Sequence, residues 1–220
     1  MNDGRRNAAQ QTTQFEEEPP MRVALTFDAE YPSRPHGRQQ SVGLILETLA
    51  KRSVQATFFL QGRWLKAHPD VGRSIAQAGH VIGNHSHYHT RMSWLSDDGI
   101  RSDIASAEAT IKEVVGVDSR PWFRCPFGDG ADDSRVVKLI AQTGYRNVDW
   151  DVDPQDWNED TTQRQILDRV LKGLERGPRN SIVLLHSWPI TTAAALGPLL
   201  DHLQMLDADL VTVDEICQRD

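Results

Sequence analysis

The 220-residue chain has few cysteines and no long hydrophobic run. Its two cysteines, Cys125 and Cys217, are too few for a disulfide scaffold or a four-thiolate zinc site. No apolar stretch approaches the roughly 18 residues that indicate a membrane span. The chain also has no excess of positive charge, since 24 Lys and Arg residues stand against 31 Asp and Glu, for a formal net charge of −7. We therefore expect no nucleic-acid partner and no attachment to an anionic membrane, and no feature implies a protein partner.

Several catalytic motifs are also missing. The sequence contains no glycine-rich phosphate loop, no Gly-x-Ser-x-Gly elbow and no Cys-x-x-Cys pair. These absences argue against P-loop nucleotide binding, a serine hydrolase of the elbow type and dithiol redox chemistry. Nothing around Cys125 indicates a lowered thiol pKa, so we expect this residue to be a small buried side chain and not a nucleophile.

The first twenty residues differ in composition from the rest. Residues 1–20 are polar, end in three glutamates and two prolines, and are predicted to form a disordered tail. They lack the apolar core of a secretory signal, which favours a cytoplasmic location, although a mature secreted domain without its leader would look similar. Residues 21–220 have the length of one domain.

From residue 21 onward, short apolar runs alternate with segments of helical spacing. Such alternation predicts an α/β fold with a parallel sheet buried on both faces, either a closed or nearly closed barrel or a doubly wound open sheet. About seven strands are expected, at 22–27, 55–60, 80–83, 122–124, 145–150, 181–185 and 210–213. Helices are expected at 41–51, 69–78, 97–115, 132–142, 162–176 and 191–206.

Polar side chains with chemical capability follow the predicted strands. In both candidate architectures the carboxyl ends of parallel strands meet at one edge, where active sites form. The residues predicted at this edge are Asp28, Glu30, His85, His87, His89, Arg124, Asp153, Asp156, Trp157 and His186. Residues far apart in the sequence are therefore expected to meet in one site.

The sharpest signal is the run His85-Ser86-His87-Tyr88-His89. If the chain turns here, His85 and His89 can converge on one metal ion while His87 points elsewhere, although a solvated polar turn would give the same pattern. Such a pair lacks an anionic third ligand, which Glu30 or Asp28 could supply. Glu30 could equally be a solvent-facing loop charge.

Two further pairs suggest acid–base chemistry. Arg124 could hold a carboxylate through two hydrogen bonds and lower its pKa, or form a structural ion pair. His186 with a nearby aspartate would be a usable general acid, although a lone histidine at a strand end is more often simply packed or exposed.

Five motifs occur in the order found in a known family. They are Thr26-Phe27-Asp28, His85-x-x-x-His89, Arg124-x-Pro126-Phe127-Gly128, Asp153-x-x-Asp156-Trp157 and Leu184-Leu185-His186. Over residues 22 to 215 the chain resembles the polysaccharide deacetylase family, also called the NodB-homology domain or carbohydrate esterase family 4. The resemblance implies a distorted (β/α) barrel of about seven parallel strands.

The resemblance also implies a function: metal-dependent hydrolysis of an acetyl group from an N-acetylated sugar or oligosaccharide. It implies Asp28 as general base, Arg124 as the residue that tunes it, His186 as general acid and Asp156 as its partner. His85 and His89 would hold one divalent ion, with zinc the first choice and cobalt or another ion as alternatives. The oxyanion would be stabilised by the Phe127 backbone N–H, and the acetyl group would lie against Trp157 and Leu184.

The sequence departs from the family pattern at Ala29, where the usual motif has the aspartate that serves as third ligand. We expect Glu30 to replace it; His36 is a weaker candidate. Two alternatives follow from the departure. One is an amidohydrolase for a non-sugar or cyclic amide, perhaps without a metal, and the other is an inactive carbohydrate-binding homologue.

Overall fold

The computed structural model describes residues 20–31 and 39–217. The expected tail, apart from its last residue, and the candidate ligand His36 lie outside the described residues. Within these described ranges the sheet has seven strands, all in parallel pairs: β1 (Arg22–Ala29), β2 (Thr57–Leu60), β3 (Val81–Asn84), β4 (Trp122–Phe123), β5 (Arg146–Asn147), β6 (Asn180–His186) and β7 (Asp209–Val211). Their order is β5-β4-β3-β2-β1-β6, and β7 pairs with the beginning of β1.

The segment after β5 joins the two sides of this curled sheet. The Val148 amide donates to the Phe123 carbonyl of β4 at 2.7 Å, whereas Val152 forms a parallel bridge with Val183 of β6. The strand expected at 145–150 is therefore shorter than predicted, Arg146–Asn147, and the chain beyond it leaves β4 and pairs with β6 only at Val152. The predicted fold, a distorted barrel of about seven parallel strands, is confirmed.

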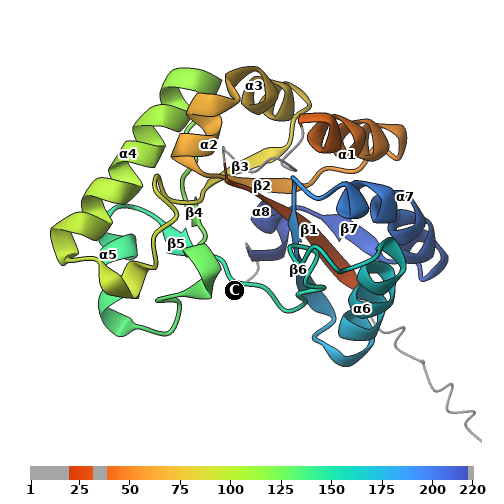
Figure 1. Ribbon diagram of the computed structural model, residues 1–220. Helices are drawn as coiled ribbons and strands as arrows, with labels where there is room; N and C mark the ends of the chain where they lie inside the picture. Colours follow the sequence, from red (N-terminus) through yellow and green to blue (C-terminus); the bar gives the residue numbers. More distant parts are fainter. Residues whose placement is uncertain (1–19, 32–38, 218–220) are drawn as a thin grey trace, which may run out of the picture.

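Helices surround the sheet (Figure 1). The larger ones are α1 (Gln39–Lys51), α3 (Pro69–Gln77), α4 (Asp97–Val115), α5 (Ser134–Gln142), α6 (Gln163–Arg176) and α7 (Ile190–Met205). Four short elements were not expected from the sequence: α2 (Gly62–Ala67), α8 (Val213–Cys217) and the 3-10 turns η1 (Met92–Trp94) and η2 (Pro126–Gly128). Each spans six residues or fewer, too short for a helical repeat to show in the sequence.

Alternation along β1 separates the core from the site. Val23, Leu25, Phe27 and Ala29 all belong to the main apolar cluster, together with side chains of α1 and α7. Burying each of the larger side chains contributes about 1.5–3 kcal/mol, so this face ties β1 firmly in place. Because successive side chains of a strand point to opposite faces, the intervening positions are free to carry polar groups.

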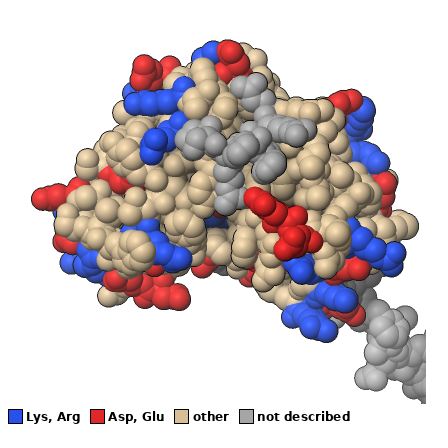
Figure 2. Space-filling model, viewed as in Figure 1, with Lys and Arg blue, Asp and Glu red and all other residues tan. Residues whose placement is uncertain are grey.

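Two surface properties complete the description. Among the described residues, no helix has both the length and the apolar character needed to cross a membrane. Acidic and basic side chains are intermixed on the face shown in Figure 2, and no extended cationic surface is seen there. The compartment in which the protein acts stays a prediction.

Candidate active site

Strand β1 and the residue that follows it place two carboxylates on the same side of the barrel. Asp28 and Glu30 are two positions apart, and each is 3% exposed. Ala29 lies between them, fully buried in the apolar cluster on the opposite face. The side chain that reaches the site is therefore the one two residues after Asp28, as expected for Glu30, since the strand is still extended at Ala29.

A tight turn after β3 brings two imidazoles together. Ser86 and His89 have positive φ angles of 62° and 59°. The Ser86 amide donates to Asn84 Oδ1 at 2.9 Å, and the His89 amide donates to Ser86 Oγ at 2.9 Å. As a result the Nε2 atoms of His85 and His89 are only 3.2 Å apart. His87 points away from them, with its ring against Tyr88 and Gly62.

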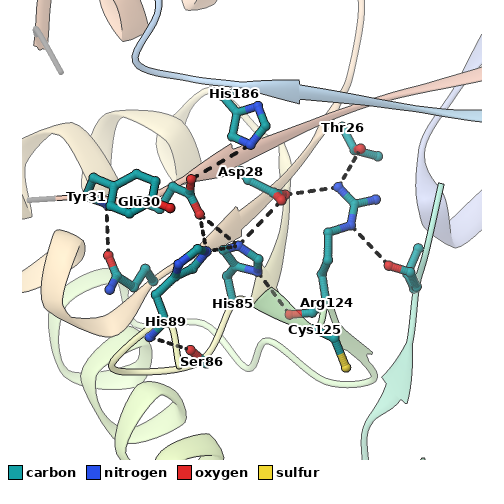
Figure 3. Close-up of polar contacts among 12 residues, drawn as sticks. Thr26, Asp28, Glu30, Tyr31, His85, Ser86, His89, Arg124, Cys125 and His186 are labelled. Atoms are coloured by element: carbon teal, nitrogen blue, oxygen red, sulfur yellow. Dashed lines mark hydrogen bonds and ion pairs between the residues drawn. The ribbon is translucent and has the colours of Figure 1, made fainter. Parts of the chain in front are cut away.

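Glu30 completes a three-residue group that could hold a metal ion (Figure 3). Its Oε2 lies 3.2 Å from His85 Nε2 and is ion-paired with His89 Nε2, and the three ligand atoms are all within 4.8 Å of one another. Two imidazole nitrogens and one carboxylate oxygen form a donor set typical of zinc sites with one open position.

The hydrogen bonding of His85 tests whether a cation fits here. Its Nδ1 lies 3.0 Å from the Arg124 carbonyl, which can only accept, so Nδ1 carries the proton and Nε2 of the neutral ring presents a lone pair. That lone pair faces Glu30 Oε2 and, at 3.5 Å, Asp28 Oδ2. The lone pair thus lies among carboxylate oxygens, and a divalent cation placed between them would bind all of these acceptors.

Electrostatics around the group favour bound positive charge. Burial alone would raise the pKa of Glu30, but hydrogen bonds with His85 and His89 hold that pKa well below its usual value. Burial lowers the pKa of His89, which favours the neutral form that ligates metals. Burial also opposes protonation of His85, yet the charges of Asp28 and Glu30 raise its pKa overall. The same carboxylates would attract a metal cation in place of that proton.

Asp28 is held by a buried arginine. Arg124 is 0% exposed, and its Nη1 donates to Asp28 Oδ1 at 3.0 Å and to Thr26 Oγ1 at 2.8 Å. Its Nε donates to the Val148 carbonyl at 3.1 Å, in the segment that closes the barrel. The guanidinium therefore orients one oxygen of Asp28 and leaves the other directed toward His85.

His186, the last residue of β6, is paired with Asp156. Its Nδ1 lies 2.7 Å from Asp156 Oδ1, while Asp156 Oδ2 accepts from the His186 amide at 2.7 Å and from Thr192 Oγ1 at 2.6 Å. Burial disfavours the imidazolium, but the Asp156 carboxylate outweighs this and raises the pKa of His186 to about 9. The free Nε2 lies 3.8 Å from Glu30 Oε1, so a protonated His186 can present a donor to the site.

A cavity of about 450 Å³ opens beside this group. Its lining includes Glu30 and all three residues predicted to contact substrate, Phe127, Trp157 and Leu184. Phe127 and Trp157 are 50% and 44% exposed, whereas Leu184 is buried at 4%. Phe127 lies in η2 with a φ of 59°.

Three residues support the site in ways that were not predicted from the sequence. Thr26 could have been found, because it shares the face of Asp28 two positions earlier in β1. Thr192 gave no local signal, since it lies in α7 and meets Asp156 only in the fold. Asp103 of α4 was likewise hidden; its carboxylate accepts from the amides of His87 and Tyr88 at 3.0 Å each and ties the histidine turn to the helix. Cys125 is buried as expected, and burial raises its pKa to about 12.

Comparison with known proteins identifies relatives along most of the chain. The family model for polysaccharide deacetylase matches residues 16–148. A chitooligosaccharide deacetylase of Azorhizobium caulinodans is 31% identical over 164 residues, covering 74% of this chain and 72% of the relative. A peptidoglycan-N-acetylglucosamine deacetylase of Bacillus cereus is 29% identical over 203 residues, covering 89% and 68%.

Solved structures similar to this one include a deacetylase and a pseudoenzyme of carbohydrate esterase family 4. The Bc1960 peptidoglycan N-acetylglucosamine deacetylase is 28% identical, with a TM-score of 0.77 and coverage of 90% of this chain and 88% of that one. BA3943 of Bacillus anthracis, a pseudoenzyme of carbohydrate esterase family 4, is 29% identical, with a TM-score of 0.79 and coverage of 90% and 65%. The predicted family and its enzyme class, carbohydrate deacetylase, are confirmed by these matches. The chain belongs to the polysaccharide deacetylase family.

Proposed function

We propose that the protein hydrolyses the acetamide group of an N-acetylated sugar residue, releasing acetate and leaving a free amine. The observation that carries this proposal is the convergence of Glu30, His85 and His89 beside a base–arginine pair and an acid–aspartate pair. Relatives named as deacetylases of chitooligosaccharide and of peptidoglycan N-acetylglucosamine support N-acetylglucosamine as the sugar.

The proposed metal is zinc, held by Glu30, His85 and His89. When bound there, it would supply Lewis-acid polarisation of the acetamide carbonyl. The Phe127 backbone N–H is proposed to donate to the oxygen of that carbonyl as negative charge develops on it. Trp157 and Leu184 would hold the acetyl methyl group in the apolar part of the cavity.

Proton transfers are assigned to the two paired groups. Asp28 accepts a proton from the attacking water, whose oxygen bonds to the carbonyl carbon, and Arg124 orients the Asp28 carboxylate. The carbon–nitrogen bond then breaks. His186 donates its proton to the departing nitrogen, so that the amine leaves neutral, and Asp156 stabilises the imidazolium beforehand.

The test is substitution of Glu30 by glutamine, with Glu159→Gln as matched control because Glu159 is an exposed carboxylate outside the ligand group. We expect Glu30→Gln to lose stoichiometric zinc, measured by elemental analysis, and at least 100-fold of acetate release from chitotetraose, while the control keeps both. Retained turnover with no zinc would instead support the metal-independent amidohydrolase.

The inactive homologue is the second outcome to be tested, because BA3943 is both a pseudoenzyme and a near structural neighbour. Zinc binding by the wild-type protein without acetate release from any N-acetylated sugar would favour it. The intact pairs Asp28–Arg124 and His186–Asp156 argue against it, since sugar binding alone requires neither an acid nor a base.

A further inference from the structure

A row of contacting side chains, three rings and one guanidinium, leads from the candidate metal site to the protein surface. The rings of His89 and Phe127 have centroids 4.5 Å apart. The Arg91 guanidinium lies over the Phe127 ring at 4.7 Å and over the Trp94 ring at 5.7 Å. Arg91 and Phe127 also line the same cavity as Glu30. Trp94 is therefore the outer end of a continuous row that begins at a metal ligand.

Trp94 is 76% exposed, which leaves most of its indole surface in contact with water. A single exposed apolar side chain is ordinary on a protein surface and carries no argument alone. Here the exposure is combined with a fixed position beside a substrate cavity. The Trp94 indole is therefore in position before a ligand binds and offers that ligand a contact surface.

The backbone that carries Trp94 is held from several sides. The Ser93 amide donates to Asp129 Oδ1 at 2.9 Å, and Arg91 contacts the other oxygen of the same carboxylate at 3.4 Å. Arg135 donates to the carbonyls of Ser93 and Leu95 at 3.2 and 3.1 Å. Met92, at the start of the same turn, is completely buried. The turn is thus fixed before any ligand arrives, which reduces the entropy lost on binding.

We propose that Trp94, supported by Arg91, binds a second sugar ring of an N-acetylated oligosaccharide whose acetylated residue occupies the cavity beside Glu30. The inference rests on the proposed function and narrows its substrate to chains of at least two sugars. The C–H face of a pyranose ring is apolar and can cover the indole, while its hydroxyl groups remain in water. The cation over the indole limits the orientations of Trp94 and adds its own attraction to the ring.

The test compares the affinity of zinc-loaded protein for chitotetraose and for N-acetylglucosamine by isothermal titration calorimetry. We expect Trp94→Ala to weaken chitotetraose binding about tenfold, equivalent to about 1.4 kcal/mol, and to leave monosaccharide binding unchanged. Arg91→Met should weaken chitotetraose binding about threefold. Met205→Ala is the control, because Met205 is 72% exposed at the far end of α7. The titrations are repeated with Asp28→Asn added to every protein. Because Asp28 is the proposed base, this substitution prevents hydrolysis of the sugar during the measurement.

Every outcome of these titrations either supports or overturns the second sugar-binding position at Trp94. An unchanged affinity of Trp94→Ala for chitotetraose overturns it, as does an equal loss for both sugars or an absence of chitotetraose binding by the wild-type protein. A selective loss for chitotetraose supports it. If that selective loss occurs in a protein that releases no acetate, the second sugar-binding position stands and the proposed hydrolysis fails.

Discussion

The alternation along β1 can be tested by placing a carboxylate at position 29, where the family pattern has one. Because Ala29 belongs to the main apolar cluster and is 0% exposed, the side chain of Ala29→Asp would point away from His85 and His89. We expect this variant to be strongly destabilised and to bind zinc no more tightly than the wild-type protein.

The expected magnitude follows from complete burial. A fully buried carboxyl has its pKa raised by about 3 units or more, and each unit corresponds to about 1.4 kcal/mol. Ala29→Asp should therefore lose about 4 kcal/mol at pH 8, a large part of the stability of a typical domain. Because the pKa of the introduced carboxyl is higher in the folded state than in the unfolded state, the loss is largest at high pH. It should shrink by about 1.4 kcal/mol per pH unit between pH 7 and 5.

The assay is urea unfolding of metal-free protein at pH 8 and pH 5, with Ala29→Asn as the matched control that adds similar volume without the charge. Competition with a chromophoric chelator then gives the zinc affinity of each folded variant. A variant Ala29→Asp as stable as Ala29→Asn, with tighter zinc binding than the wild-type protein, would show that position 29 faces the metal. The assignment of Glu30 as third ligand would then be wrong.

Three further outcomes are expected. Asp103→Asn should weaken zinc binding about 10- to 100-fold in the chelator assay, since it loosens the turn that carries both histidine ligands; an affinity equal to that of the exposed control Asp98→Asn would contradict this. Cys125, whose pKa is about 12, should react with iodoacetamide at pH 8 on the order of 1,000-fold more slowly than an ordinary thiol, and rapid labelling detected by mass spectrometry would refute its burial. Burial lowers the pKa of His80, so its neutral form stabilises the fold above the unfolded pKa of about 6.5 and this contribution is lost as the pH falls. Unfolding of His80→Asn should accordingly depend less on pH between 7 and 5, and slopes equal to those of the wild-type protein would count against it.

Much of the site could be predicted because its residues follow strands. Asp28, Arg124 and His186 lie at the carboxyl ends of parallel strands, so topology alone brings them to one edge. Glu30 could be assigned because side chains two positions apart share a face of a strand. These inferences required only local patterns and one rule of sheet geometry.

The remaining features depend on contacts that no local pattern contains. Asp103 looks like any acidic residue of a helix, and only the packing of α4 against the histidine turn gives it two amide partners. Thr192 meets Asp156 across 36 positions of sequence. Residues 145–150 were predicted as one strand, but only Arg146 and Asn147 pair with β4, and the chain next pairs at Val152, with β6.

The segment after β5, which closes the barrel, also holds Arg124 in position beside Asp28. Arg124 donates to the carbonyl of Val148 at 3.1 Å and to that of Asp149 at 3.3 Å, just before the bridge at Val152. If residues 148–152 separated locally from β6, the buried Arg124 guanidinium would lose both of these acceptors. It would then no longer orient Asp28, although β1, β2 and β3 would stay paired. During gradual denaturation, hydrolysis should therefore stop in a subglobal transition that precedes loss of the sheet.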